Sequence, residues 1–351
     1  MRVHISDLKE GDLLSSDAFN HFGLNVMAKG TRLTSYEIAK LTQHSIDYVE
    51  VEMEAPVAAG YRTIESGLPP RWLPSIKPLY ENAISGCENL FRKALEEGKV
   101  SEEDVDRSFG PLMSSFQMEK DVVSMLLLLN TDDDYTYQHS VQVGMLSYYL
   151  ASWLGFPEEE AARIGKAGFL HDIGKCRISK DILNKPEKLT SEEYREIKRH
   201  TLYGEEIILS TYDDPFLSSA ALQHHERMDG TGYPHGIDGI EISPIAKIVA
   251  VADVYSAMIS TRSYQQKRDL LYVLRELYRM SFHELDPHTT HTFIRHMIPN
   301  FIGKSVELDN GQFGTFIMTH PSEFFRPLIQ VGEDFLDLSE QRELEITQIY
   351  M

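Results

Sequence analysis

The chain has 351 residues, of which 42% are hydrophobic and 10% aromatic, and this composition indicates a folded protein rather than a disordered one. Lys and Arg total 34 against 54 Asp and Glu, and the formal net charge of −20 argues against a broad surface for nucleic acid polymers or anionic lipid. With two cysteines, no apolar core of signal-peptide length and no run near the roughly 20 apolar residues of a membrane-spanning helix, we expect a cytoplasmic protein without disulfides.

The organisation along the chain predicts one large helical domain between two small β-rich modules. Residues 1–55 consist of short strands and turns with one helix near 35–45, and residues 56–74 have the Pro and Gly content of a linker. Apolar residues recur at helical spacing from 75 to 298. From 299 to 351 the period returns to two, with a hairpin expected at the Asn310-Gly311 turn. The predicted fold class is therefore mainly α.

Four predicted helices each carry a histidine or aspartate on the same stripe as their apolar residues, namely His139, His171, His200 and Asp253. The helix of His200 is expected over 190–209, beginning with a capping box. Burying an unpaired polar group costs several kcal/mol, so each of these side chains needs a partner. That partner is either a metal ion or, more commonly for a lone inward histidine, a backbone group.

Two further features favour the metal. His171 and Asp172 stand together at a predicted helix end, with Lys175 following. His224 and His225 are adjacent and precede a Gly-rich turn. Because neighbouring residues on a helix diverge by about 100°, both histidines can reach one metal only where a helix ends or bends, and the Gly-rich turn predicts such an end.

The motifs H-D-x-x-K at 171–175, H-H-E-x-x-D-G-x-G-Y-P at 224–234 and A-D-V-Y-S-A-M at 252–258 together resemble the HD-GYP family, a branch of the HD phosphohydrolase superfamily. The resemblance spans about residues 120–290. It implies an HD-type helical bundle in the 75–298 domain, and more weakly a regulatory role for the N-terminal module.

The resemblance also implies a site for two divalent metal ions. One ion would be held by His139, His171, Asp172 and Asp253, and the other by Asp172, His200, His224 and His225. A ligand set of imidazole and carboxylate without thiolate suits iron or manganese, with zinc or nickel as substitutes, and the resemblance favours iron. Tyr135 stands where members with three metals carry a glutamate, which favours two ions here.

The activity implied is hydrolysis of cyclic di-GMP to pGpG or GMP in bacterial signalling. Two close cations would lower the pKa of a bridging water, and the resulting hydroxide would attack phosphorus. Asp172 and Lys175 are the predicted catalytic residues, and Lys175 and Arg262 are the predicted phosphate contacts, although solvated surface charge is the ordinary role of Lys and Arg. Gln265 replaces a second basic residue that many members carry.

Gly232, Tyr233 and Pro234 form the loop that names the family, and they are the remaining predicted substrate contacts. Tyr233 is expected to stack on a guanine or hydrogen-bond to it. A plain tight turn is the alternative for these three residues.

Other functions remain open on the sequence alone. The same metal pair would hydrolyse another cyclic dinucleotide such as a cyclic GMP-AMP, since only the pocket selects the bases. A receptor without catalysis would use the β modules to contact signalling proteins. An iron oxygenase is a third alternative, against which the G-Y-P loop argues. The acidic surface is also compatible with a homodimer.

Overall fold

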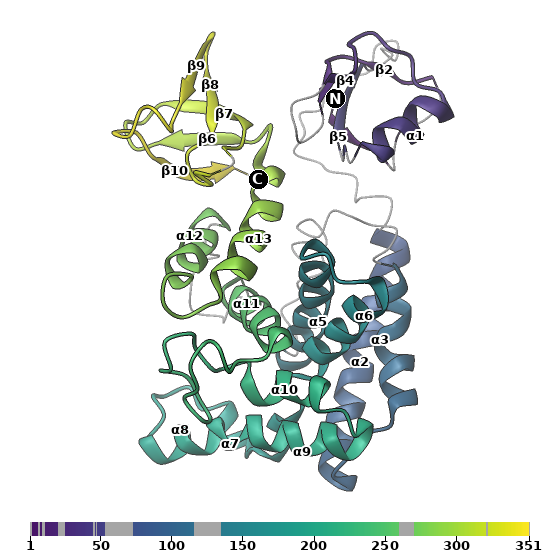
Figure 1. Ribbon diagram of the computed structural model, residues 1–351, viewed down its shortest axis with the longest axis vertical. Helices are drawn as coiled ribbons and strands as arrows, with labels where there is room; N and C mark the ends of the chain where they lie inside the picture. Colours follow the sequence, from purple (N-terminus) through teal and green to yellow (C-terminus); the bar gives the residue numbers. More distant parts are fainter. Residues whose placement is uncertain are drawn as a thin grey trace. The chain divides into compact units, whose positions relative to one another are not determined.

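The computed structural model describes residues 2–5, 8, 11–19, 25–44, 46, 48–52, 73–115, 135–259, 270–320 and 322–350. The chain divides into two compact units, Met1–Pro70 and Arg71–Met351 (Figure 1). Most of the predicted linker, residues 56–72, lies outside the described residues. The predicted fold class, a helical bundle with small β-rich modules toward both ends of the chain, is confirmed. In the described part of the chain, no helix has both the length and the apolar character needed to cross a bilayer.

The N-terminal unit is built from short antiparallel strands and one helix. The strands are β1 (Arg2–His4), β2 (Leu13–Leu14), β3 (Ala18–Phe19), β4 (Asn25–Met27) and β5 (Tyr48–Glu52), and the helix is α1 (Ser35–Gln43). One sheet has the order β1-β5-β2, while β3 pairs with β4. Leu14, Leu33 and Leu41 are fully buried at the centre of its small core. The helix expected near 35–45 is confirmed.

The second unit is mostly helical. Its helices are α2 (Leu73–Glu97), α3 (Glu102–Ser115), α5 (Tyr135–Trp153), α6 (Glu158–Leu170), α7 (Lys180–Leu183), α8 (Ser191–Lys198), α9 (His200–Tyr212), α10 (Pro215–Gln223), α11 (Pro244–Ile259), α12 (Leu270–Met280) and α13 (Pro287–Met297), with 3₁₀ turns η2 (Ile173–Arg177) and η3 (Ile298–Phe301). Every residue of α5 from Gln138 to Ala151 is buried, because α2, α6, α11 and α13 all pack around this helix.

The helix expected over 190–209 is in fact two helices. The predicted capping box at Thr190 and Glu193 is present at the start of α8, but α8 ends at Lys198 and α9 begins at His200. The imidazole Nδ1 of His200 donates to the carbonyl of Ile197 at 2.6 Å, which satisfies a carbonyl at the end of α8. The helix break therefore lies where the His200 ring turns back onto the preceding turn.

The C-terminal strands form one antiparallel sheet. They are β6 (Ser305–Leu308), β7 (Phe313–Met318), β8 (Leu328–Val331), β9 (Asp334–Asp337) and β10 (Ile346–Tyr350), in the order β10-β6-β7-β8-β9. Gly311 has φ 79° in the turn between β6 and β7, and the predicted hairpin is confirmed. Val306, Phe316 and Ile329 of this sheet are buried in the same apolar cluster as the helices.

Candidate metal centre

All seven side chains predicted as metal ligands lie close together in the second unit. They come from α5 (His139), the α6–η2 junction (His171 and Asp172), the start of α9 (His200), the end of α10 (His224 and His225) and α11 (Asp253). They form three groups in which the ligand atoms all lie within 4.8 Å of one another, namely His139 with His171 and Asp253, His171 with Asp172 and His224, and His200 with His224 and His225. The structure thus brings every predicted ligand to one place.

Asp172 lies between two sets of imidazoles. Its Oδ2 is 3.3 Å from Nε2 of His171 and 3.9 Å from Nε2 of His139. Its Oδ1 is 3.3 Å from Nε2 of His200 and 3.9 Å from Nε2 of His224. Because each carboxylate oxygen faces a different pair of rings, Asp172 has the position of a group shared by two cations.

Backbone carbonyls fix the orientation of three of these rings. Nδ1 of His171 donates to the carbonyl of Gly168 (2.7 Å), Nδ1 of His200 to that of Ile197 (2.6 Å), and Nδ1 of His224 to that of Ala221 (2.9 Å). A neutral imidazole that holds its proton on Nδ1 presents the lone pair of Nε2, and such outer hydrogen bonds are typical of metal-binding histidines.

The protonation states suit metal binding. Burial lowers the pKa of His200 to about 4 and that of His224 to about 3, so both rings are neutral near pH 7. Burial favours the neutral acid of Asp172, but the charges of Lys175 and then His171 hold the pKa of Asp172 well below its usual value. The site therefore offers neutral rings at His200 and His224 and an ionised carboxylate at Asp172. At His171 burial opposes the charged ring, but the charge of Asp172 raises the pKa of His171 above its usual value.

Two buried atoms of the cluster make no hydrogen bond within the described residues, Nε2 of His171 and Oδ1 of Asp172. Leaving such an atom unpaired costs about 1–3 kcal/mol. Both atoms face the other ligands, where divalent cations would pair them. The unpaired atoms and the all-imidazole and carboxylate donor set fit the divalent metals expected from the sequence.

Glycines allow the elements that carry the ligands to touch. A Cβ added at Gly174 in η2 would lie 2.0 Å from the carbonyl oxygen of His200. A Cβ added at Gly204 in α9 would lie 3.1 Å from Cβ of Ala221 in α10. Contact of η2 with α9, and of α9 with α10, is what brings Asp172 beside His200 and His224.

Lys175 lies at the edge of the cluster. Its Nζ is 2.5 Å from Oδ2 of Asp172, and its side chain is 25% exposed. The ammonium therefore neutralises Asp172 while remaining within reach of solvent. The predicted role of Lys175 as a phosphate contact is compatible with this position.

The G-Y-P loop folds directly onto the cluster. A Cβ at Gly232 would lie 2.5 Å from the carbonyl oxygen of His225, so no side chain fits there. The Tyr233 ring stacks on the His225 ring with centroids 4.6 Å apart, and Nζ of Lys198 lies 4.9 Å from the Tyr233 centroid. The Tyr233-Pro234 peptide is cis. Tyr233 thus supports the ring of a predicted ligand, and its contact with a guanine stays a prediction.

Glu226 was not predicted as a site residue, although it organises this loop. It is 2% exposed, and its carboxylate accepts from three successive backbone N–H groups, those of His235 (2.7 Å), Gly236 (3.2 Å) and Ile237 (3.2 Å). The sequence feature that could have identified Glu226 is its place as an acidic residue between the paired histidines and the Gly-rich turn. Periodicity alone cannot show that this carboxylate points inward.

We expect Glu226→Ala to loosen the loop, because it leaves three backbone donors without their acceptor. Charge-assisted hydrogen bonds contribute about 1.5–3 kcal/mol each, but His235 and Gly236 are exposed, so water can replace part of the loss. The free energy of unfolding should therefore fall by roughly 2–4 kcal/mol, less than the sum of the three bonds. Glu226→Gln keeps one acceptor oxygen and should lose less. Denaturant unfolding of both variants measures this, and equal stability of Glu226→Ala and the natural protein would contradict the role.

Arg262, the other predicted phosphate contact, and Gln265 lie outside the described residues.

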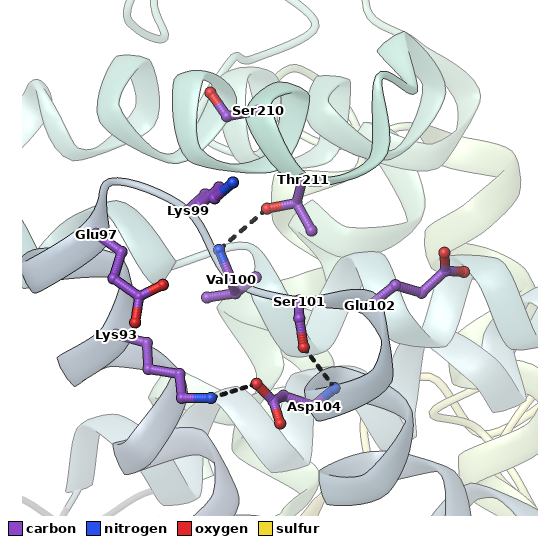
Figure 2. A pocket seen from close by; sticks show the side chains of 9 residues that line it. All are labelled: Lys93, Glu97, Lys99, Val100, Ser101, Glu102, Asp104, Ser210 and Thr211. Carbon is purple, nitrogen blue, oxygen red and sulfur yellow. Dashed lines mark hydrogen bonds and ion pairs between the residues drawn. The ribbon is translucent and has the colours of Figure 1, made fainter.

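A pocket of about 320 Å³ lies elsewhere, at the turn between α2 and α3 and the end of α9 (Figure 2). Its lining includes Lys93, Asp104 and Thr211 and none of the predicted site residues. Since His200 begins α9 and Thr211 is near its end, this pocket is not the metal centre.

Comparison with known proteins identifies the family. Residues 122–289 match the HD domain. A cyclic di-GMP phosphodiesterase of Pseudomonas aeruginosa, PA4108, is 32% identical over 72% of this chain and 61% of its own length. A cyclic di-GMP phosphodiesterase of Thermotoga maritima is 38% identical over 51% of this chain and 50% of its own. The 3'3'-cGAMP-specific phosphodiesterase 3 of Vibrio cholerae is 36% identical over 39% of this chain and 30% of its own.

The matched HD domain contains all seven clustered side chains. Residues 122–289 belong to the HD domain family, and the H-H-E-x-x-D-G-x-G-Y-P segment within them has the pattern of the HD-GYP branch. The family binds divalent metals. The chain spans less than two thirds of the length of each of these three relatives.

Proposed function

We propose that this protein is a phosphodiesterase that hydrolyses cyclic di-GMP to pGpG or GMP with two bound divalent metal ions. The observation that carries the proposal is the position of Asp172, whose two carboxylate oxygens face different imidazole pairs. Two relatives that are named cyclic di-GMP phosphodiesterases support the choice of substrate.

The proposed metal ligands fall into two sets that share Asp172. His139, His171 and Asp253 hold one ion, and His200, His224 and His225 hold the other. Bound there, the divalent cations supply Lewis acidity that lowers the pKa of water and neutralises charge on the phosphate oxygens. We propose iron as the natural metal, with manganese as a substitute, since no thiolate joins the donor set.

The protein's own groups bind and orient the substrate. Lys175 holds Asp172 ionised and offers its ammonium to a phosphate oxygen, since an ammonium carries three donors. Arg262 supplies a second cation for the phosphates. The G-Y-P loop keeps His225 in place through Tyr233 and covers the cluster beside Lys198.

A second candidate substrate is 3'3'-cGAMP. It is favoured by the relative from Vibrio cholerae that is named for that specificity. The metal ligands act on the phosphodiester, which both cyclic dinucleotides contain. Selection between them therefore depends on contacts with the bases.

The test is product analysis on protein purified without oxygen and loaded with Fe²⁺ or Mn²⁺. We expect about two ions per chain and conversion of cyclic di-GMP to pGpG or GMP, faster than that of 3'3'-cGAMP. Faster turnover of 3'3'-cGAMP would establish the second candidate. Tight binding of cyclic di-GMP with no product from metal-loaded protein would overturn the enzymatic function and leave a receptor.

A further inference from the structure

His139 is oriented differently from the other buried histidines of the centre. Its Nδ1 lies 3.0 Å from Oγ of Ser256, whereas Nδ1 of His171, His200 and His224 bonds to backbone carbonyls. A carbonyl can only accept, so it fixes the proton on Nδ1. A serine hydroxyl can donate or accept, and it does not fix the proton by itself.

Gln142 determines which way the Ser256 hydroxyl points. The hydroxyl donates to Oε1 of Gln142 at 2.9 Å. Because a hydroxyl has one hydrogen, Oγ of Ser256 is left to accept from Nδ1–H of His139. Neutral His139 then presents the lone pair of Nε2, which lies 3.0 Å from Oδ1 of Asp253. Two acceptors at this distance repel each other unless a cation lies with them, so this tautomer is the one that binds metal.

Burial shields this pair from water. Gln142 and Ser256 are 1% and 0% exposed, so water does not compete for their hydrogen bonds. Nε2 of Gln142 makes no hydrogen bond within the described residues, so Oε1, which accepts from Ser256, is the amide atom of Gln142 that is paired.

We propose that Gln142 and Ser256 are positioning residues that hold His139 in the tautomer with its proton on Nδ1, and thereby set the metal affinity of the His139, His171 and Asp253 group. This inference rests on the proposed function only in requiring that this group binds a metal ion. Nothing in it depends on which cyclic dinucleotide is the substrate.

The hydrogen bonds from Gln142 through Ser256 to His139 form a relay, and two variants interrupt it at different points. Ser256→Ala removes the acceptor for Nδ1–H. Gln142→Leu leaves the hydroxyl free to donate to Nδ1 instead, which moves the ring proton to Nε2. Ser256→Thr keeps the hydroxyl and should restore the natural behaviour. Ser147→Ala is the matched control, because Ser147 is equally buried in α5 and its Oγ makes no hydrogen bond within the described residues.

The first measurement is Mn²⁺ binding against a competing chelator, with thermal unfolding to confirm that each variant folds. We expect two Mn²⁺ per chain in the natural protein and in Ser147→Ala. In Ser256→Ala and Gln142→Leu, one ion should bind about 10–100-fold more weakly while the other is retained, as is usual when an outer hydrogen bond to a ligand is lost. Unchanged affinity for both ions in both variants would overturn the relay and leave the proposed function intact.

The second measurement needs no metal. Nitrogen NMR of the metal-free protein labelled with ¹⁵N-histidine distinguishes the two tautomers of His139, and His139→Gln assigns its signals. Without metal, Nε2 faces the Asp253 carboxylate, so only the proton on Nδ1 reports on Ser256 and Gln142. We expect Nδ1 to carry a proton in the natural protein and to lose it in part of the Gln142→Leu molecules. An Nδ1 without a proton in the natural protein would overturn the inference. If the natural protein binds no Mn²⁺ although the tautomer is as expected, the proposed function fails and the relay stands without its effect on affinity.

Discussion

Asp172→Asn should lower phosphodiesterase activity at least about 100-fold and reduce the bound metal below one ion per chain. Loss of an outer hydrogen bond to a metal ligand already costs about 10–100-fold in affinity or activity. Asp172 is proposed to contact both ions directly, and its ionised carboxylate faces four imidazoles. An amide of the same shape carries no charge and leaves Lys175 without its ion-pair partner. Metal analysis and initial rates on cyclic di-GMP check this.

Asp104→Asn is the matched control for this substitution. Asp104 also accepts from a lysine at 2.5 Å, that of Lys93, but it lies in the pocket between α2, α3 and α9 (Figure 2). Loss of this more exposed ion pair should leave both the metal content and the rate close to those of the natural protein. Two ions bound to Asp172→Asn would show that this residue does not bridge the site.

The clustering of the seven proposed ligands could be predicted in part because buried polar side chains leave a pattern in the sequence. His139, His171, His200 and Asp253 are polar residues on otherwise apolar helix faces, and a polar residue in that position needs a partner. His224 and His225 required a helix end to converge, and α10 does end there. Apolar periodicity and turn residues, which depend on local sequence, identified these side chains as buried polar groups. The resemblance to the HD-GYP family was needed to assign them to metal ions.

The contacts that orient the ligands could not be predicted in the same way. Glu226 and Ser256 act through hydrogen bonds whose partners depend on how a loop folds and how two helices pack. The break between α8 and α9 was missed for a related reason, since the His200 ring bonds to the carbonyl of Ile197 only once it is turned into the cluster. These features depend on tertiary packing, and the sequence shows only residue types compatible with them.

The close approach of η2 and α9 is another tertiary feature, and it leads to the second large effect. Gly174→Ala should lower the free energy of unfolding by about 1–3 kcal/mol or more, since inserting a methyl group into a filled space costs that much. The new Cβ would lie 2.0 Å from the carbonyl oxygen of His200 and 2.4 Å from the amide nitrogen of Gly204. Both are backbone atoms, so η2 must move away from α9.

That displacement would act on the metal centre, because η2 follows Asp172 directly and α9 begins at His200. We expect Gly174→Ala to unfold roughly 5–10 °C lower than the natural protein and to bind metal more weakly. Gly204→Ala is the milder substitution for comparison. Its Cβ would lie 3.1 Å from Cβ of Ala221, and a shift of a few tenths of an ångström would relieve that contact. Thermal unfolding and Mn²⁺ binding should therefore rank Gly174→Ala well below Gly204→Ala. The reverse order would mean that the contact between η2 and α9 does not determine the distance from Asp172 to His200.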